Sequence, residues 1–342
     1  MNRCLLLALY ALASSAGTAH SQQGEWKDPA PHIAKLVTVA DSVQLEVLDW
    51  GGSGPTIVLL AGLGDTGHVF DDFAPMLTTR YRVIAVTRRG HGRSSAPTSG
   101  YEFARLAQDV VRVVDAMGIK KPILIGHSFA GEELHVIGAR NAEMIGGLVY
   151  VDAAFDRGDD SDNQAYDAVA RTLPAAPNAG PSDRASFATL NAFLKKTQGS
   201  LVPEAHLRAR YLGNADGTVA RMWAPDVAVR QAISKEMQAQ YKPYRPERIH
   251  LPALAIYAAP KSVDDMIRPW YPPGDSIRQR ASRLYELQRA RVENHIKWFQ
   301  QFAPGARVAE IAGAHHLFVS HPREVVQQID AFVSSLPADR RP

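Results

Sequence analysis

Apolar residues come in short runs separated by longer amphipathic stretches, and the first runs have the character of β-strands. Residues 35–40 and 43–50 predict two strands joined by a tight turn at Asp41-Ser42. Pro55 then opens a continuous apolar run over residues 56–61, as expected for a strand buried on both faces. The N-terminal region therefore predicts two strands that lead into the interior of a sheet.

The next part of the chain alternates strand patterns with helix patterns. Strands are predicted over residues 82–87, 123–126 and 145–151, and helices over residues 103–117 and 129–140. Strands that alternate with helices of this length are typical of a parallel sheet with crossover helices. We therefore predict a mostly parallel α/β sheet flanked by helices.

The second half predicts two more strands, but only after a long interval. The strands are residues 253–258 and 307–311, and the stretch 276–302 and the closing segment 323–336 have helical patterns. The interval 154–251 contains helical patterns interrupted by several prolines. We predict that it is a helical cap inserted into a core made of residues 22–153 and 252–342.

Residues 1–21 have the pattern of a secretory signal peptide, with Arg3 before a short apolar run and small residues after it. The run is shorter than the roughly 20 residues that a membrane-spanning helix needs, so no stable membrane anchor is expected. The single cysteine, Cys4, lies within this segment. A protein secreted or held in the periplasm is predicted, without disulfides, cysteine-ligated metal or a cysteine nucleophile.

The charge pattern argues against nucleic acid as a partner. Lysine and arginine total 38 against 35 acidic residues, a net charge of +3, and the basic residues form no dense block. The expected partner is a small molecule.

The strongest chemical signal is the segment Gly-His-Ser-Phe-Ala-Gly at residues 126–131, between a predicted strand and a predicted helix. It resembles the nucleophile elbow of the α/β-hydrolases, in which small residues permit a sharp turn around the serine. Ala130 stands where the strict pattern has its second glycine, and Gly131 follows it. The resemblance implies an eight-stranded, mostly parallel α/β-hydrolase sheet with Ser128 as the nucleophile.

The family's chain order, serine then acid then histidine, implies a histidine after the last strand. His315 and His316 stand there, and Pro322 follows His315 by seven residues. That spacing favours His315 as the general base and leaves His316 as the alternative.

Chain order does not identify the acid. Most α/β-hydrolases place it after the next-to-last strand, where Asp264 and Asp265 come slightly late in this chain. A minority place it after the preceding strand, where Asp152 directly follows residues 148–151. Asp152 is the first choice, with Asp264 and Asp265 as the alternatives.

The resemblance also implies two backbone N–H groups that bind the oxyanion, those of Leu63 and Phe129. The Gly-x-Gly-x-x-Gly run at residues 62–67 also matches a dinucleotide fingerprint, but no acidic residue ends the next predicted strand. His315, His316 and His321 lack a companion cluster with metal-ligand spacing. No cofactor and no metal are therefore expected.

The resemblance implies a Ser-His-Asp hydrolase that forms an acyl-enzyme, and cleavage of a carboxylic ester is the first expectation. Peptidase, lactonase, acyltransferase, haloperoxidase and carbon-carbon hydrolase activities use the same arrangement of residues, because a fold does not determine its substrate. Aromatic residues and Met222 in residues 154–251 suggest a small apolar or aromatic substrate. A hydrolase-like binding protein with negligible turnover is the alternative of a different class.

Overall fold

The structure is a computed structural model that describes residues 26–158, 161–199, 201–241 and 247–340. The predicted signal peptide, residues 1–21, lies outside these ranges. Among the described residues, no helix has both the length and the apolar character needed to span a bilayer.

An eight-stranded sheet forms the centre of the molecule, in the order β1-β2-β4-β3-β5-β6-β9-β10. The strands are β1 (Ile33–Ala40), β2 (Val43–Gly51), β3 (Thr56–Leu60), β4 (Arg82–Val86), β5 (Ile123–His127), β6 (Gly147–Val151), β9 (Ala253–Ala258) and β10 (Arg307–Ile311). β2 pairs antiparallel with β1 and with β4, and all the other pairs are parallel. The predicted mostly parallel eight-stranded sheet is confirmed.

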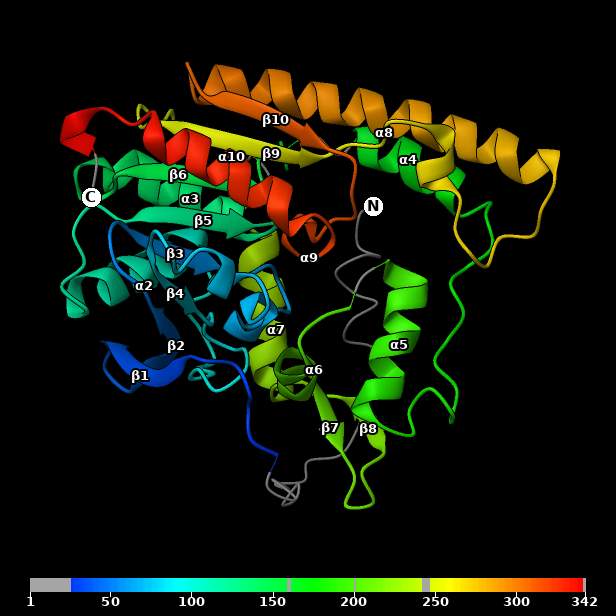
Figure 1. The fold of residues 1–342 in the computed structure, drawn as a ribbon, viewed down its shortest axis with the longest axis horizontal. Coiled ribbons are helices and arrows are strands. Elements are labelled where there is room, and N and C mark those ends of the chain that lie inside the picture. Colours follow the sequence, from blue (N-terminus) through cyan, green and yellow to red (C-terminus); the bar gives the residue numbers. More distant parts are fainter. Residues whose placement is uncertain (1–25, 159–160, 200, 242–246, 341–342) are drawn as a thin grey trace.

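Helices cover both faces of this sheet (Figure 1). They are α2 (Phe103–Ala116), α3 (Ala130–Arg140), α8 (Asp275–Phe302), α9 (Leu317–Ser320) and α10 (Pro322–Ser334). α2, α3 and α8 pack on one face with Val58, Leu124 and Tyr150 of the strands. α10 packs on the other face, together with the 3-10 turns η1 (Gly67–Phe70) and η2 (Ala74–Met76). Successive strand residues alternate between these two apolar layers, which explains the continuous apolar runs of the central strands.

In its described residues, the segment between β6 and β9 contains four helices and a small hairpin. These are α4 (Ser161–Ala170), α5 (Phe187–Gln198), α6 (Glu204–Arg210), β7 (Tyr211–Gly213), β8 (Val219–Met222) and α7 (Val227–Gln238). The sequence pattern predicts only helices here, so the antiparallel β7–β8 pair is a feature that was not predicted. Figure 1 shows α5, α6 and this hairpin on the side to which the arrows of β5 and β9 point.

One part of this segment packs against an element that lies beyond residue 251. α4 lies along α8, and Leu173 joins Met266, Ile277 and Leu284 in one apolar cluster. Met266 belongs to the 3-10 turn η4 (Val263–Met266), and the remaining short turns are η3 (Ala142–Met144) and η5 (Ala338–Arg340). The inserted segment therefore packs against η4 and the start of α8, which lie outside the predicted cap. The predicted cap boundaries at residues 154 and 251 stay a prediction.

Candidate active site

The predicted catalytic residues gather at one edge of the sheet because the parallel strands end there together. Leu60 is paired with Gly126, His127 with Val151, and Ala258 with Ile311. Ligand sites of open α/β sheets lie beyond the carboxyl ends of the strands. Ser128, Asp152 and the loop that carries His315 all follow these ends.

Ser128 forms the sharp turn between β5 and α3. Its φ of 53° lies in the left-handed region, which an L-residue adopts only when its surroundings hold it there. Its N–H donates to the Val151 carbonyl at 3.3 Å, and its carbonyl accepts from Gly131 at 3.1 Å. Ser128 is partly exposed, so it lies on a turn that backbone hydrogen bonds hold and that is open in part to solvent.

Gly131, and not residue 130, is the glycine that this turn requires. A Cβ atom at Gly131 would lie 2.1 Å from the carbonyl oxygen of Ala153, directly after Asp152. Ala130 is fully buried and its methyl group fits. The departure from the strict elbow pattern therefore leaves the turn intact, because the close contact between α3 and the loop after β6 falls one residue later.

Asp152 faces His315. Its Oδ2 atom is 2.5 Å from His315 Nδ1, and its Oδ1 atom accepts the N–H of Ala258 at 3.0 Å. The Asp152 backbone has a φ of 45° and donates to the Ile256 carbonyl at 2.7 Å. The backbone of β9 therefore holds the carboxylate against the imidazole.

The other two candidate acids have different partners. Asp264 is exposed and forms an ion pair with Arg278 at 2.9 Å. Asp265 accepts the backbone N–H groups of Lys261 and Ser262 at 2.7 and 2.9 Å and caps η4. Of the three candidate carboxylates, the structure brings Asp152 to His315.

The two adjacent histidines point to different carboxylates. His316 Nε2 lies 3.1 Å from Asp65 Oδ2, and Asp65 also meets His206 at 3.3 Å and Arg210 at 3.2 Å. Burial alone would raise the pKa of Asp65, but the hydrogen bonds from His206 and His316 lower it well below its ordinary value. His316 thus links the histidine loop to α6, whereas His315 is the histidine held by Asp152.

His127, next to the nucleophile, is a site residue that the sequence analysis missed. Its Nε2–H group donates to the His315 carbonyl at 3.1 Å, and its ring lies 4.5 Å from the His315 ring, centroid to centroid. Burial, together with the nearby His315 and His316, lowers the pKa of His127 well below its ordinary value. A neutral His127 therefore positions the histidine loop against the elbow.

The loop after β3 approaches Ser128 closely. A Cβ atom at Gly62 would lie 3.3 Å from Ser128 Cβ and 3.0 Å from His127 Nδ1. Leu63 packs into the apolar cluster that contains Phe129, whose N–H precedes the first turn of α3 and lacks an intrahelical acceptor. The residues predicted to bind the oxyanion, Leu63 and Phe129, therefore flank the nucleophile.

Arg88 and His91, in the turn after β4, hold this loop in place. Arg88 donates to the carbonyls of Ala61 at 2.8 Å and Gly62 at 3.2 Å. His91 Nε2 accepts the N–H of Gly64 at 3.1 Å. Burial and the nearby Arg88 lower the pKa of His91 to about 4, so the ring is neutral and its Nε2 remains an acceptor. The turn after β4 thus sets the shape of the loop after β3, which carries the Leu63 N–H predicted to bind the oxyanion.

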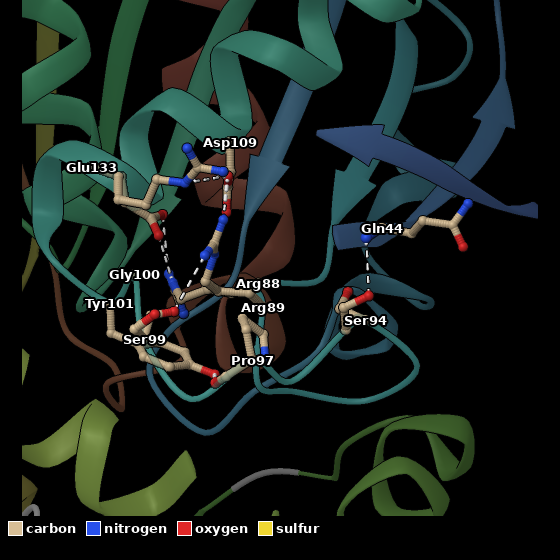
Figure 2. A network of polar contacts seen from close by, with 12 residues as sticks. Gln44, Arg88, Arg89, Ser94, Pro97, Ser99, Gly100, Tyr101, Asp109 and Glu133 are labelled. Atoms are coloured by element: carbon tan, nitrogen blue, oxygen red, sulfur yellow. Dashed lines mark hydrogen bonds and ion pairs between the residues drawn. The ribbon is translucent and has the colours of Figure 1, made fainter. Parts of the chain in front are cut away.

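Arg88 is itself fixed by Glu133 of α3, and Figure 2 shows the two side chains meeting beside the Arg89–Asp109 pair. Arg88 Nε is 2.5 Å from Glu133 Oε1, with both side chains buried. The Arg88 guanidinium also lies 4.9 Å above the Phe129 ring. This one side chain therefore connects the oxyanion loop to the start of α3.

We expect Glu133→Ala to lower the free energy of unfolding by about 3–5 kcal/mol, because it leaves Arg88 buried without its counter-charge. Urea unfolding followed by tryptophan fluorescence measures this change. Asp264→Ala is the matched control: it breaks the exposed pair with Arg278 and should cost no more than about 1 kcal/mol. Equal effects of the two variants would contradict the role assigned to Glu133.

A hollow beside the loop after β3 is lined by the turn after β4 and by the segment between β6 and β9. Its lining residues are Leu63, Gly64, Thr66, Gly90, His91, Gly92, Ala209, Arg210, Met222, Trp223 and Pro225. Most of the lining surface is apolar. Among Met222 and the aromatic residues of the predicted cap, residues 154–251, Met222 and Trp223 line it, whereas Phe155 packs against the core and Phe187 within the inserted segment.

Three side chains of the site could hold a metal. The ligand atoms of Asp65, His127 and His316 lie within 4.8 Å of one another. Asp65, however, already has Arg210 as a cationic partner in addition to its two histidines. Asp65 is therefore satisfied by its protein partners, whereas His127 Nδ1 is buried and takes part in no hydrogen bond within the described residues.

Comparison with known proteins identifies the class. Residues 57–328 match the sequence profile described as "Alpha/beta hydrolase family", so the chain belongs to that family. The structure is similar to the crystal structure of E-2-(acetamidomethylene)succinate hydrolase, with a TM-score of 0.58 and 20% identity over 89% of this chain and 100% of the other. It is also similar to the structure of Est816, described as an N-acyl homoserine lactone degrading enzyme, with a TM-score of 0.54 and 19% identity over 87% of this chain and 100% of the other. At these identities the likeness shows the fold.

Two curated relatives show how varied the family's reactions are. The chain is 31% identical over 101 residues to 2-(acetamidomethylene)succinate hydrolase of Mesorhizobium japonicum, covering 30% of this chain and 36% of the relative. It is 38% identical over 102 residues to a non-heme chloroperoxidase of Burkholderia pyrrocinia, covering 29% and 36%. The chain thus aligns with about a third of the length of each. The two relatives are named for different reactions, so they do not identify the reaction of this chain.

Proposed function

We propose that this protein is a serine hydrolase that cleaves a carboxylic ester of a small apolar or aromatic substrate. The observation that carries the proposal is the 2.5 Å contact between His315 Nδ1 and Asp152 Oδ2, at the sheet edge where Ser128 forms a positive-φ turn. A serine hydroxyl is a weak nucleophile, so it needs a base whose own orientation is fixed. The geometry around Asp152 supports this function for His315.

The proposed reaction proceeds through an acyl-enzyme. His315, with its Nδ1–H donated to Asp152, takes the Ser128 hydroxyl proton at Nε2 while Oγ attacks the ester carbonyl. The Leu63 and Phe129 N–H groups stabilise the oxyanion, and His315 returns the proton to the departing alcohol. His315 then takes a proton from water as the water attacks the acyl-enzyme, and it passes that proton to Ser128 Oγ as the free acid leaves. The cycle uses no cofactor.

The substrate class and the location in the cell are further parts of the proposal. Met222 and Trp223 in the wall of the hollow favour an apolar or aromatic group near Leu63. Export to the periplasm or beyond is proposed from the pattern of residues 1–21 alone.

The test is a substrate panel with the purified protein that begins at residue 22. We expect turnover of p-nitrophenyl acetate, butyrate or octanoate, and much slower turnover of the matched p-nitroanilides, because an amide has a poorer leaving group. Turnover of a lactone or anilide without the esters would overturn the ester assignment and keep the hydrolase. Absence of turnover together with absence of labelling by a fluorophosphonate would favour the binding protein instead.

A further inference from the structure

Four metal-binding side chains from two segments of the chain converge outside the candidate active site. Asp28 and His32 precede β1, whereas His68 lies in η1 and Asp71 directly follows it. One ligand atom from each of the four lies within 4.8 Å of the others. None of the four is assigned a role in the proposed reaction.

Four of the distances between these atoms fit the spacing of ligands around a tetrahedral metal ion. Asp28 Oδ2 is 3.3 Å from His32 Nε2 and 3.2 Å from His68 Nδ1. Asp71 lies between the same two rings, with Oδ1 3.3 Å from His32 Nε2 and Oδ2 3.1 Å from His68 Nδ1. Zn²⁺ with bonds of about 2.0–2.1 Å separates its tetrahedral ligand atoms by about 3.3 Å.

Most of these atoms are buried and lack hydrogen bonds, although His68 Nδ1 and Asp71 Oδ2 form one at 3.1 Å. The side chains of His32 and Asp71 are only 5% and 3% exposed. Both ring nitrogens of His32, Asp28 Oδ2 and Asp71 Oδ1 take part in no hydrogen bond within the described part of the chain. Buried polar atoms are normally satisfied, so atoms that converge without hydrogen bonds indicate a shared ligand.

The donor set identifies the kind of cation. Two imidazoles disfavour Ca²⁺ and Mg²⁺, which prefer oxygen ligands, and suit Zn²⁺. The two aspartates balance a divalent charge, and four protein ligands leave no open position, as in structural zinc sites. Glu46 faces the other nitrogen of His68, with Oε1 3.8 Å from Nε2, where a carboxylate can orient a metal-bound imidazole.

We propose that Asp28, His32, His68 and Asp71 form a structural site for Zn²⁺ or a similar divalent transition metal. The ion joins the segment before β1 to the turn that continues the predicted oxyanion loop. This proposal departs from the metal-free protein expected from the sequence, and it does not depend on the proposed reaction.

The competing explanation is a cluster of ion pairs without a metal. Although burial alone would lower it, the pKa of His68 rises to about 10 through its contacts with Asp71 and Glu46. Protonated rings could then pair with the carboxylates in place of a metal. An experiment must therefore separate bound metal from bound protons.

The experiment measures metal in the protein beginning at residue 22, purified without a polyhistidine tag. After incubation with Zn²⁺ and exhaustive dialysis, elemental analysis should find about one zinc per chain. EDTA should lower the Tm by several degrees, since loss of a bound ligand removes its stabilisation of the folded state. The Co²⁺-loaded protein should show the intense visible absorption of tetrahedral cobalt.

Asp28→Asn and His32→Ala should weaken zinc binding by more than about 100-fold, above the 10- to 100-fold typical of residues that only orient a ligand. Asp28→Asn keeps the side-chain volume and changes a partly exposed residue, so a folded variant is expected. His295→Gln, at another buried histidine, is the matched control and should keep the zinc. His316→Gln tests whether the ion lies instead between Asp65 and His127.

Two results would overturn the proposal. The first is absence of retained zinc and a Tm that neither zinc nor EDTA changes, which would leave the four side chains as an ion-pair cluster. The second is zinc that Asp28→Asn and His32→Ala retain and His316→Gln loses, which would assign the metal to the other cluster. Since Ser128 and His315 are unchanged in both variants of the proposed site, ester hydrolysis is measured independently.

Discussion

Ser128→Ala is expected to lower kcat/KM for ester hydrolysis by at least about 10³-fold, because it removes the only atom that forms the acyl-enzyme in the proposed reaction. The turn itself should survive. Alanine differs from serine by a single oxygen, and the φ of 53° is held by backbone hydrogen bonds to Val151 and Gly131. Steady-state kinetics with the best p-nitrophenyl ester measures the effect.

The control for this variant is its stability. A Tm close to that of the wild type, with the same far-UV circular dichroism, assigns the loss to chemistry. A folded Ser128→Ala protein that retains more than about a tenth of the wild-type kcat/KM would contradict the proposed nucleophile.

Asp152→Asn is expected to lower kcat by about 10⁴-fold, the size of effect known for the equivalent change in a serine protease. An asparagine can still accept the Ala258 N–H at Oδ1. The NH₂ group it then presents to His315 Nδ1 favours the tautomer with the proton on Nε2, and that tautomer cannot accept the Ser128 proton. Single-turnover measurements separate this effect from product release.

Asp264→Asn and Asp265→Asn are the comparison for this prediction. Asp264 pairs with Arg278 at the surface and Asp265 caps η4, so both variants should keep kcat within about threefold of the wild type. If Asp264→Asn lost activity and Asp152→Asn kept it, the acid would be the one that most relatives use.

Much of the framework of the fold was predictable because a strand buried on both faces is a continuous run of apolar residues in the sequence. The run 253–258 matches the fully buried strand β9 residue for residue, the run 307–311 matches the partly exposed edge strand β10, and β3 and β4 are each one residue shorter than predicted. The hairpin β7–β8 was missed because the proline-rich interval was interpreted as helical throughout. Its turn, Asn-Ala-Asp-Gly at residues 214–217, was an available signal.

The site was only partly predictable. The turn at Ser128 was predictable because it depends on small residues that are close in sequence, within residues 126–131. The choice of Asp152 depends on the reach of a side chain from the end of β6 to His315, over 163 residues of sequence separation. The roles of Arg88, His91 and Glu133 were not predictable, because their partners meet only in the folded chain: two carbonyls of the loop after β3 for Arg88, the Gly64 N–H for His91, and Arg88 itself for Glu133.

The proposed metal site had a sequence signal of a different kind. Asp28 with His32 and His68 with Asp71 are pairs three or four residues apart, a spacing that brings two side chains to one ligand. Neither pair is diagnostic alone, because acidic residues near histidines are common. Only the packing of η1 against the segment before β1 joins them.

The most direct test of the central claim is to label the wild-type protein with a fluorophosphonate and locate the adduct by peptide mass spectrometry. The proposed mechanism predicts one phosphonyl group per chain on Ser128, formed rapidly in the wild type, slowly in Asp152→Asn and not at all in Ser128→Ala. An adduct on another serine, or equal labelling of Ser128→Ala, would contradict the proposal that Ser128 is the nucleophile of this hydrolase.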